Sequence, residues 1–183
     1  MDEERLINHL SVYGAISHIT IFLEFQHGSV TQSLIHRFKY YEKVYLGKYL
    51  VELWAAKLQT IDWIKDIDVI VPLPLHWRKK IKRGYNQSEV LARYLARALH
   101  KPVVTNSLIR HKYTKSQASQ ALDRWENMKD VFSLAKAQQL KGKHVLIIDD
   151  VVTTGASITN CVKAIYCAKP SAVSIASLSA VRE

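Results

Sequence analysis

The chain has 183 residues, 48% of them hydrophobic and 23% charged, and its formal net charge is +10. This length predicts one globular domain. No apolar run approaches the roughly 18 residues that span a membrane, so we expect no membrane insertion. Residues 1–5 lack a signal-peptide pattern, and two cysteines are too few for a disulfide framework or a zinc ribbon. We therefore expect a cytoplasmic protein with buried thiols, whose positive charge suits a polyanionic ligand.

Strand and helix patterns alternate along the chain. Short runs of apolar and β-branched residues predict strands at residues 19–25, 67–71, 103–105, 108–110, 131–132, 145–148 and 172–178. Apolar positions at steps of three and four predict helices within residues 1–16, 30–53, 88–99, 122–127 and 156–169, with a break or two separate helices near Gly47. Alternation of this kind predicts an α/β fold, in which a parallel sheet is flanked by helices.

A basic segment follows the predicted strand that ends at residues 72–74, where two prolines stop strand pairing. Residues 78–83 hold five cations in six positions, and these repel one another unless an anion lies among them. We expect a basic loop that binds an anion, and the alternative is a solvated loop. Asn86 or Ser88 is expected to cap the helix that follows.

The strongest functional signal lies at residues 145–158. An apolar run is followed by Asp149 and Asp150, then by a hydroxyl-rich turn around Gly155, and then by a helical pattern. Ligands of open α/β sheets bind at this strand-to-helix edge, where backbone N–H groups favour a phosphate. Adjacent carboxylates repel a phosphate but accept hydrogen bonds from sugar hydroxyls. The pattern therefore predicts a ribose 5-phosphate site. The alternative, a junction capped by two acids, leaves two adjacent charges uncompensated.

This segment resembles the 5-phosphoribosyl-1-pyrophosphate (PRPP) motif of type I phosphoribosyltransferases, because an apolar strand, paired acids, two apolar residues, Thr-Thr-Gly and a final hydroxyl follow in order. Further blocks resemble the ComF family of phosphoribosyltransferase-like proteins, which are linked to bacterial competence. These blocks are residues 35–40, residues 71–77 with 83–88, and a set made of Arg110, Thr114, Gln117, Arg124, Asn127 and Phe132. The resemblance covers residues 30–183. It implies one type I phosphoribosyltransferase-like domain over residues 1–183, with residues 1–29 as a small N-terminal hood segment.

Two features depart from the family pattern. ComF proteins usually begin with a four-cysteine zinc ribbon, which this sequence lacks, so we expect no zinc. Glu42 stands where the family usually has a glycine, which changes the expected shape of that turn.

The resemblance implies a role for each residue of the site. The paired acids bind the ribose hydroxyls and assist catalysis electrostatically, the turn after them holds the 5′-phosphate, and a second turn with nearby cations holds pyrophosphate. The paired acids are Asp149 and Asp150, and the turn that holds the 5′-phosphate comprises Thr153, Thr154, Gly155, Ala156 and Ser157. The second turn comprises Pro74, Leu75 and His76. The cations near it are Lys82, Arg83 and Lys39, with Arg78 as a further candidate. The expected cofactor is Mg²⁺ carried by PRPP, without a dedicated set of protein ligands.

The expected reaction is Mg-dependent transfer of a phosphoribosyl group, with release of pyrophosphate, to an acceptor that the sequence does not identify. The resemblance also implies a link to competence and DNA uptake, a partner from the competence machinery, and a homodimer as in many relatives. A second hypothesis is a non-catalytic factor that handles single-stranded DNA and keeps the PRPP site as a sensor. Trp77, Tyr85 and Tyr113 would then stack on bases, and the cations at residues 78–83 and 110–115 would contact phosphates. A third hypothesis, an inactive scaffold, is disfavoured because the motif keeps all its polar residues.

Overall fold

The computed structural model describes residues 15–25, 31–33, 44–75, 77–110 and 131–181. The strands are β1 His18–Phe25, β2 Val69–Pro72, β3 Leu108–Arg110, β4 Phe132–Leu134, β5 His144–Val152 and β6 Ala172–Val181. The α-helices are α3 Val44–Gln59, α4 Trp77–Arg83, α5 Gln87–Ala98 and α7 Ala156–Tyr166, and the 3-10 helices are η2 Asp62–Asp66 and η3 Ala137–Gln139. The helix predicted within residues 122–127 lies outside the described residues, and the helix predicted within residues 1–16 lies almost entirely outside them.

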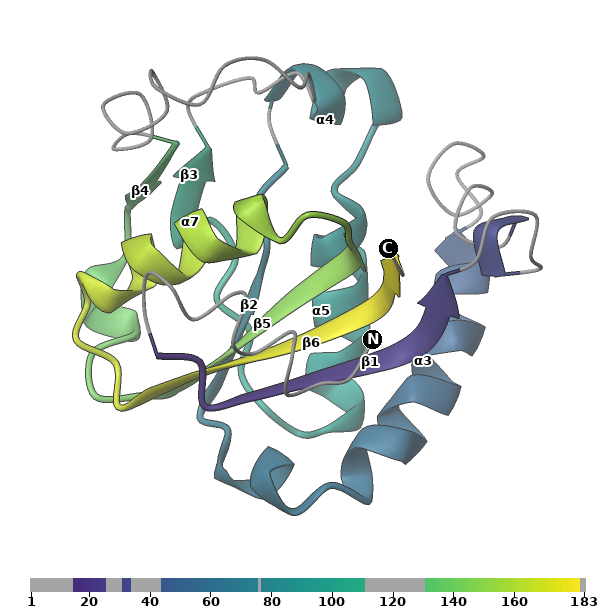
Figure 1. Cartoon of the computed structure of the whole chain (residues 1–183), viewed down its shortest axis with the longest axis horizontal. Coiled ribbons are helices and arrows are strands. Elements are labelled where there is room, and N and C mark those ends of the chain that lie inside the picture. The colour runs from purple at the N-terminus through teal and green to yellow at the C-terminus, as the bar shows by residue number, and fades with distance from the viewer. Residues whose placement is uncertain (1–14, 26–30, 34–43, 76, 111–130, 182–183) are drawn as a thin grey trace.

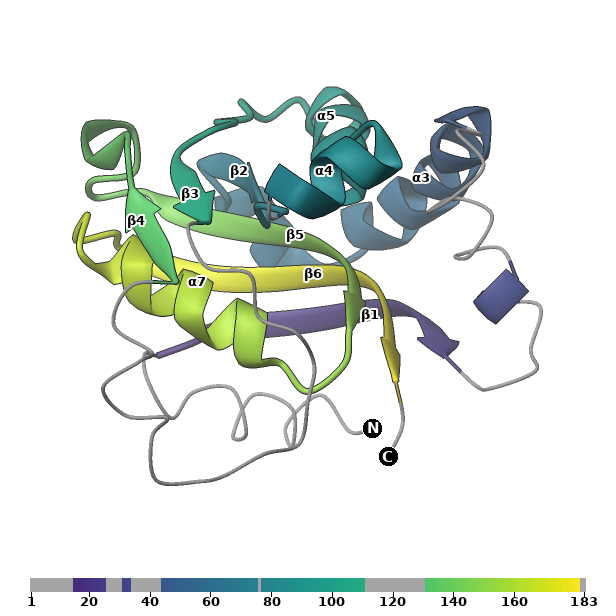
Figure 2. The same cartoon turned by 90° about the horizontal axis from the view of Figure 1, so that it is seen from above.

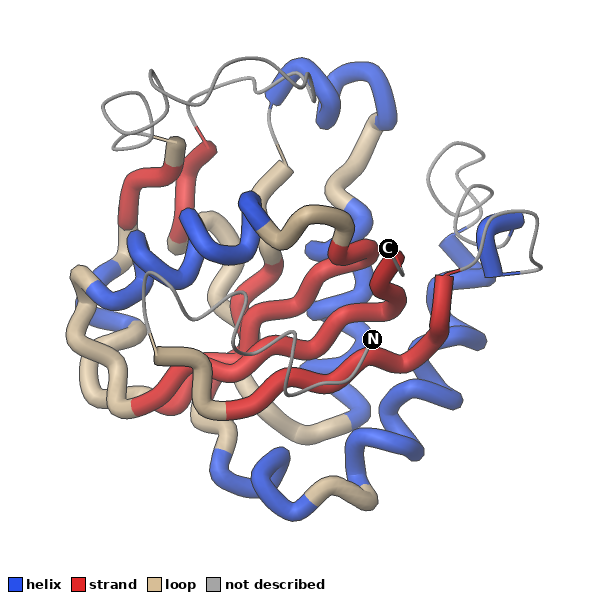
Figure 3. Tube along the Cα trace, in the orientation of Figure 1, coloured by secondary structure: helices blue, strands red, loops and turns tan. Residues whose placement is uncertain are grey.

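Four parallel strands form the central sheet in the order β1-β6-β5-β2 (Figures 1 and 3). The predicted strand at residues 103–105 is reduced to a single parallel bridge between Ile70 and Val103. Pro102 has no N–H to donate, and Asn106 takes a positive φ of 58° that ends the extended segment. The α/β class with a parallel sheet is confirmed.

The central strand β5 contributes to two hydrophobic cores, because successive side chains of a strand point to opposite faces. Val145 and Ile147 pack in one core with α7 and the antiparallel hairpin of β3 and β4. Leu146 and Ile148 pack in the other core, against α3 and α5. Figure 2 shows these two helices on one side of the sheet and α7 on the other. Both faces of β5 are therefore covered, which explains its continuous apolar run.

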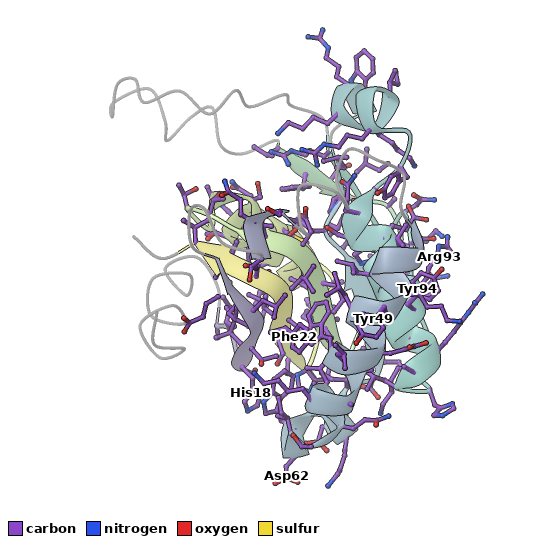
Figure 4. All side chains as sticks on the ribbon, turned by 90° about the vertical axis from the view of Figure 1, so that its right-hand side faces the viewer. His18, Phe22, Tyr49, Asp62, Arg93 and Tyr94 are labelled. Atoms are coloured by element: carbon purple, nitrogen blue, oxygen red, sulfur yellow. The ribbon has the colours of Figure 1, made fainter. Side chains whose placement is uncertain are left out.

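Helix α3 is continuous at Gly47, whereas residues 34–43, where a break could also fall, lie outside the described residues. The helix begins at Val44 and runs through Gly47. Its inner face buries Trp54 and Leu58 completely. Trp54 stacks on Phe22 of β1, with ring centroids 6.1 Å apart; Phe22 is labelled in Figure 4. Burial of such side chains outweighs the roughly 1 kcal/mol that a glycine costs inside a helix.

Two further expectations are wrong. The basic residues 78–83 belong to the helix α4 and not to a loop, because Lys and Arg side chains lose little freedom in a helix and Gly84, at φ 80°, then ends it. Cys161 is buried, but Cys167 is exposed. Six residues along a helix rotate a side chain by about 240°, so Cys167 faces away from the core that holds Cys161. In the described part of the chain, none of the helices combines the length and apolarity needed to cross a bilayer.

Candidate functional site

A glycine turn joins β5 to α7 at the carboxyl end of the sheet. Gly155 occupies the N-cap position of α7 with φ 71° and ψ −9°, a left-handed conformation that costs a residue with a Cβ atom about 1–2 kcal/mol. Its carbonyl accepts hydrogen bonds from the backbone N–H and the hydroxyl of Thr159, which fixes the first turn of the helix. Thr153 and Thr154 are exposed before the glycine, and Ser157 is half-buried after it.

The two adjacent acids of β5 have different surroundings. Asp149 is only 5% exposed, whereas Asp150 is half-buried. The Asp149 Oδ1 atom accepts hydrogen bonds from the Ser88 hydroxyl at 3.2 Å and from the backbone N–H of Asp150 at 2.8 Å. One carboxylate is therefore fixed by the protein, and its neighbour is more accessible to solvent.

A half-buried cation, Arg110, lines the same site as the first of these acids. Burial lowers the pKa of the Arg110 guanidinium, and the negative charge of Asp149 acts in the opposite direction. The same guanidinium lies over the Phe132 ring, 5.4 Å from its centroid. Arg110 therefore supplies positive charge beside Asp149, a carboxylate that would be costly to bury alone.

These groups line one cleft of about 160 Å³. Nine of the residues predicted from the sequence lie in its wall: Pro74, Leu75, Arg83, Asp149, Asp150, Thr153, Thr154, Gly155 and Ser157. Ala156 is exposed in the first turn of α7 and is not part of the wall. His76 and Lys39 fall outside the described residues, as does the side chain of Lys82. The structure thus brings the two predicted halves of the site together, and the binding roles of these residues remain predictions.

Five other polar or charged residues of the wall were not among the residues expected to bind PRPP: Lys79, Asn86, Gln87, Ser88 and Arg110. Lys79 and Arg83 lie four residues apart on α4 and so share one face of it. That spacing was readable in the sequence, but a basic loop was expected there. Arg78 lies elsewhere on the helix, with its guanidinium 5.3 Å from the centroid of the Trp77 ring.

The only individual role expected for Asn86 or Ser88 was that of a helix cap. Asn86 does occupy the N-cap position of α5, but it makes no side-chain cap hydrogen bond. Its amide donates to the Leu73 carbonyl at 3.0 Å instead. The partners of both side chains lie in other elements, so a local reading of the sequence could not identify them.

The Phosphoribosyl transferase domain family matches residues 85–183, which is 99 of the 183 residues. The chain belongs to this family. The matched part of the phosphoribosyl transferase domain contains β5, the glycine turn and α7, together with Asn86, Gln87 and Ser88.

Relatives named for competence or for DNA utilization are similar to this phosphoribosyl transferase domain protein. Competence protein F of Haemophilus influenzae is 33% identical over 130 residues, which are 68% of this chain and 57% of the relative. DNA utilization protein YhgH of Escherichia coli K12 is 33% identical over 129 residues, which are 68% and 56%. Competence protein ComFC of Bacillus subtilis is 29% identical over 114 residues, which are 62% and 44%. The chain spans about half the length of these relatives. The predicted resemblance to the ComF family is confirmed.

Solved structures confirm the type I phosphoribosyltransferase fold. Glutamine PRPP amidotransferase from B. subtilis superposes with a TM-score of 0.53 at 17% identity, over 77% of this chain and 30% of that one. Adenine phosphoribosyltransferase from Leishmania tarentolae superposes with a TM-score of 0.52 at 12% identity, over 86% and 90%. At such identities the similarity concerns the fold alone.

Proposed function

We propose that the protein binds PRPP and transfers its phosphoribosyl group to an acceptor, with release of pyrophosphate. The observation that carries this proposal is the meeting of the Gly155 turn, the Asp149–Asp150 pair and the cations of α4 around one cleft. Support comes from a structure of the same fold, adenine phosphoribosyl transferase from Trypanosoma brucei in complex with AMP, pyrophosphate and ribose-5-phosphate, with a TM-score of 0.51 and 12% identity.

The cleft offers a different kind of group to each part of PRPP. The N–H groups and hydroxyls of the turn at residues 153–157 would hold the 5′-phosphate. The carboxylates of Asp149 and Asp150 would accept hydrogen bonds from the ribose hydroxyls. Lys79 and Arg83 would neutralise the pyrophosphate beside the Pro74–Leu75 turn. Lys82, His76 and Lys39 remain proposed contributors to the same pyrophosphate site.

The proposed reaction is a displacement at ribose C1. The bond from C1 to the pyrophosphate oxygen breaks and its electron pair leaves with pyrophosphate, while a lone pair of the acceptor forms the new bond to C1. A proton is then lost from the acceptor to solvent. Positive charge develops on the ribose ring as the bond breaks, and the Asp150 carboxylate would stabilise it. Lys79 and Arg83 stabilise the negative charge that collects on the leaving group.

The side chains of the cleft fit a magnesium ion that arrives with its substrate. Within the described ranges, no three His, Cys, Asp or Glu side chains lie close enough to hold a metal by themselves. Mg²⁺ at phosphate sites commonly takes only one or two carboxylates and fills its other positions with phosphate oxygens and water. Asp149 and Asp150 can supply those carboxylates. When bound, the ion would add positive charge at the leaving pyrophosphate.

The direct test is calorimetry with PRPP and Mg²⁺. The double variant Asp149→Asn plus Asp150→Asn is expected to lose detectable binding, because both acceptors of the ribose hydroxyls lose their charge. The matched control is Asp62→Asn plus Asp66→Asn, which removes the same charge from the exposed helix η2. Asp62 lies at the lower end of the molecule in Figure 4, with α4 at the top. Equal affinity in wild type and the first double variant would reject the site.

Once PRPP binding is established, screening bases and amines for PRPP-dependent pyrophosphate release would identify the acceptor.

A second candidate function rests on the outer face of α4. Trp77 is 54% exposed and Ile81 is 74% exposed, one turn apart, with the Arg78 guanidinium on the indole. An exposed indole among cations suits the bases and phosphates of single-stranded DNA. Of the other two aromatic residues considered for stacking, Tyr85 packs partly against the core and Tyr113 lies outside the described residues. The protein would then be a non-catalytic competence factor with PRPP as a signal.

Anisotropy with labelled single-stranded DNA over a salt series tests this second function. Trp77→Ala is expected to weaken binding by about tenfold, since stacking on one aromatic side chain contributes roughly 1–3 kcal/mol. Tyr49→Ala is the control, because Tyr49 is similarly exposed (62%) but lies on α3. Absence of binding at low salt, or equal losses in both variants, would exclude this face as a DNA contact.

A further inference from the structure

We propose that the first turn of α5, formed by Asn86, Gln87 and Ser88, is a positioning unit that fixes three separate parts of the cleft. It would set the orientation of Asp149, the direction of Arg83 and the position of the Leu73 carbonyl. This inference rests on the proposed function, since it assigns these parts to different portions of PRPP. None of the three residues is proposed to react.

Burial is the first indication. Asn86, Gln87 and Ser88 are consecutive polar residues with exposed fractions of 9%, 1% and 3%. Polar side chains are rarely buried in succession, because each loses its hydrogen bonds to water unless the protein replaces them. The replacements here should therefore show what the segment does.

Each of the three side chains bonds to a different element of the cleft. The Asn86 amide donates to the carbonyl of Leu73, which begins the turn after β2, at 3.0 Å. The Arg83 guanidinium of α4 donates to the Gln87 side-chain oxygen at 3.0 Å. The Ser88 hydroxyl donates to Asp149 of β5 at 3.2 Å. Three consecutive residues thus link the ends of two strands and the helix α4 at one place.

The N-cap position shows that local helix stability does not explain this arrangement. Asn86 has an extended backbone at φ −98° and ψ 115°, as a cap should, yet its side chain makes no cap hydrogen bond. A side-chain cap is typically worth about 1 kcal/mol. The amide is instead used on a carbonyl 13 residues earlier in the chain, so the interaction serves the turn after β2.

The support of this turn is rigid. Leu91, Ala92 and Leu95, which follow it on α5, are completely buried between the helix and the sheet. A helix anchored in this way can hold attached side chains within the small tolerances that binding requires. Ser88 holds one ribose-binding carboxylate, and Gln87 holds one pyrophosphate-binding cation. The loss of each should therefore affect a different part of the ligand.

The experiment measures two probes separately: ribose 5-phosphate, and inorganic pyrophosphate with Mg²⁺. Ser88→Ala is expected to weaken ribose 5-phosphate by about tenfold and pyrophosphate by less than about twofold. Gln87→Met, which keeps the side-chain length without the acceptor, is expected to do the reverse. Asn86→Ala should act like Gln87→Met, because it releases the turn beside the pyrophosphate. The control is Ser174→Ala. The Ser174 hydroxyl is fully buried and is hydrogen-bonded to His144. Ser174 lies in the part of β6 that pairs with the start of β5.

Opposite selectivity of Ser88→Ala and Gln87→Met would support the positioning unit, provided that Ser174→Ala leaves both affinities unchanged. Equal losses for both probes in each variant, in proportion to the fall in melting temperature, would show a purely structural role and overturn the inference while the proposed function stands. Wild-type protein that binds neither probe nor PRPP would overturn both.

Discussion

Two glycines with similar positive φ values allow strain to be separated from function. Gly155 has φ 71° in the turn that lines the cleft, and Gly142 has φ 65° before β5. A Cβ atom added at Gly142 would meet no atom within 4 Å. Gly142→Ala therefore introduces backbone strain alone, and Gly155→Ala introduces similar strain at the proposed phosphate site.

The expected loss of stability follows from the left-handed conformation. A Cβ atom there costs about 1–2 kcal/mol, and each kcal/mol lowers the melting temperature of a protein of this size by roughly 2–4 °C. Each alanine variant should therefore melt about 2–8 °C below wild type. If the chain relieves the strain at residue 155 by rotating the neighbouring peptides, their N–H groups turn away from the phosphate.

Calorimetry with PRPP, performed well below both melting temperatures, separates the two effects. Gly155→Ala is expected to bind at least about tenfold more weakly than wild type, and Gly142→Ala should bind as wild type does. The reasoning would be refuted by wild-type affinity in Gly155→Ala, or by the same loss of affinity in both variants.

Three further predictions concern the described core and surface. Burial, and to a smaller extent the charge of His18, lowers the pKa of His144 in the folded protein. The imidazole of an unfolded chain titrates near about 6.5. The neutral His144 side chain therefore stabilises the fold above that pH, and this stabilisation is lost as the pH falls through the folded pKa. The urea midpoint should therefore fall less between pH 7 and pH 5 in His144→Asn than in wild type. Ellman's reagent should modify Cys167 in the native protein but reach Cys161 only after denaturation, since burial strongly raises the pKa of the Cys161 thiol. Trp54→Ala should lower the free energy of unfolding by about 3–5 kcal/mol, measured by urea denaturation, because this side chain is 0% exposed.

Each of these three predictions can be contradicted by one measurement. His100→Asn, at an exposed position with φ 54° that Asn tolerates, should keep the wild-type pH dependence; the same flattening in this control would contradict the role of His144. Native labelling of both thiols would contradict the burial of Cys161. A loss below about 1 kcal/mol in Trp54→Ala would mean that the core of α3 is looser than described.

The sequence predicted most where neighbouring residues decide the structure. The apolar run at residues 145–148 had to be a strand covered on both faces, and the acids and glycine after it had to lie at its carboxyl end. The parallel α/β class followed from the alternation of patterns, and the family followed from motifs in the right order. Periodicity also located α5, with Leu91 and Leu95 buried as expected.

Other features depend on contacts between distant parts of the chain. Helix α3 continues through Gly47 because of what Trp54 and Leu58 bury against, and α4 became a helix whose two faces present different residues. The bond from Ser88 to Asp149 joins residues 61 positions apart. Local propensities and spacings carry no information about such a contact, because it exists only after both elements have packed on the same sheet. The sequence by itself determined what the ends of the strands carry, and the tertiary structure decided which side chains hold those groups in place.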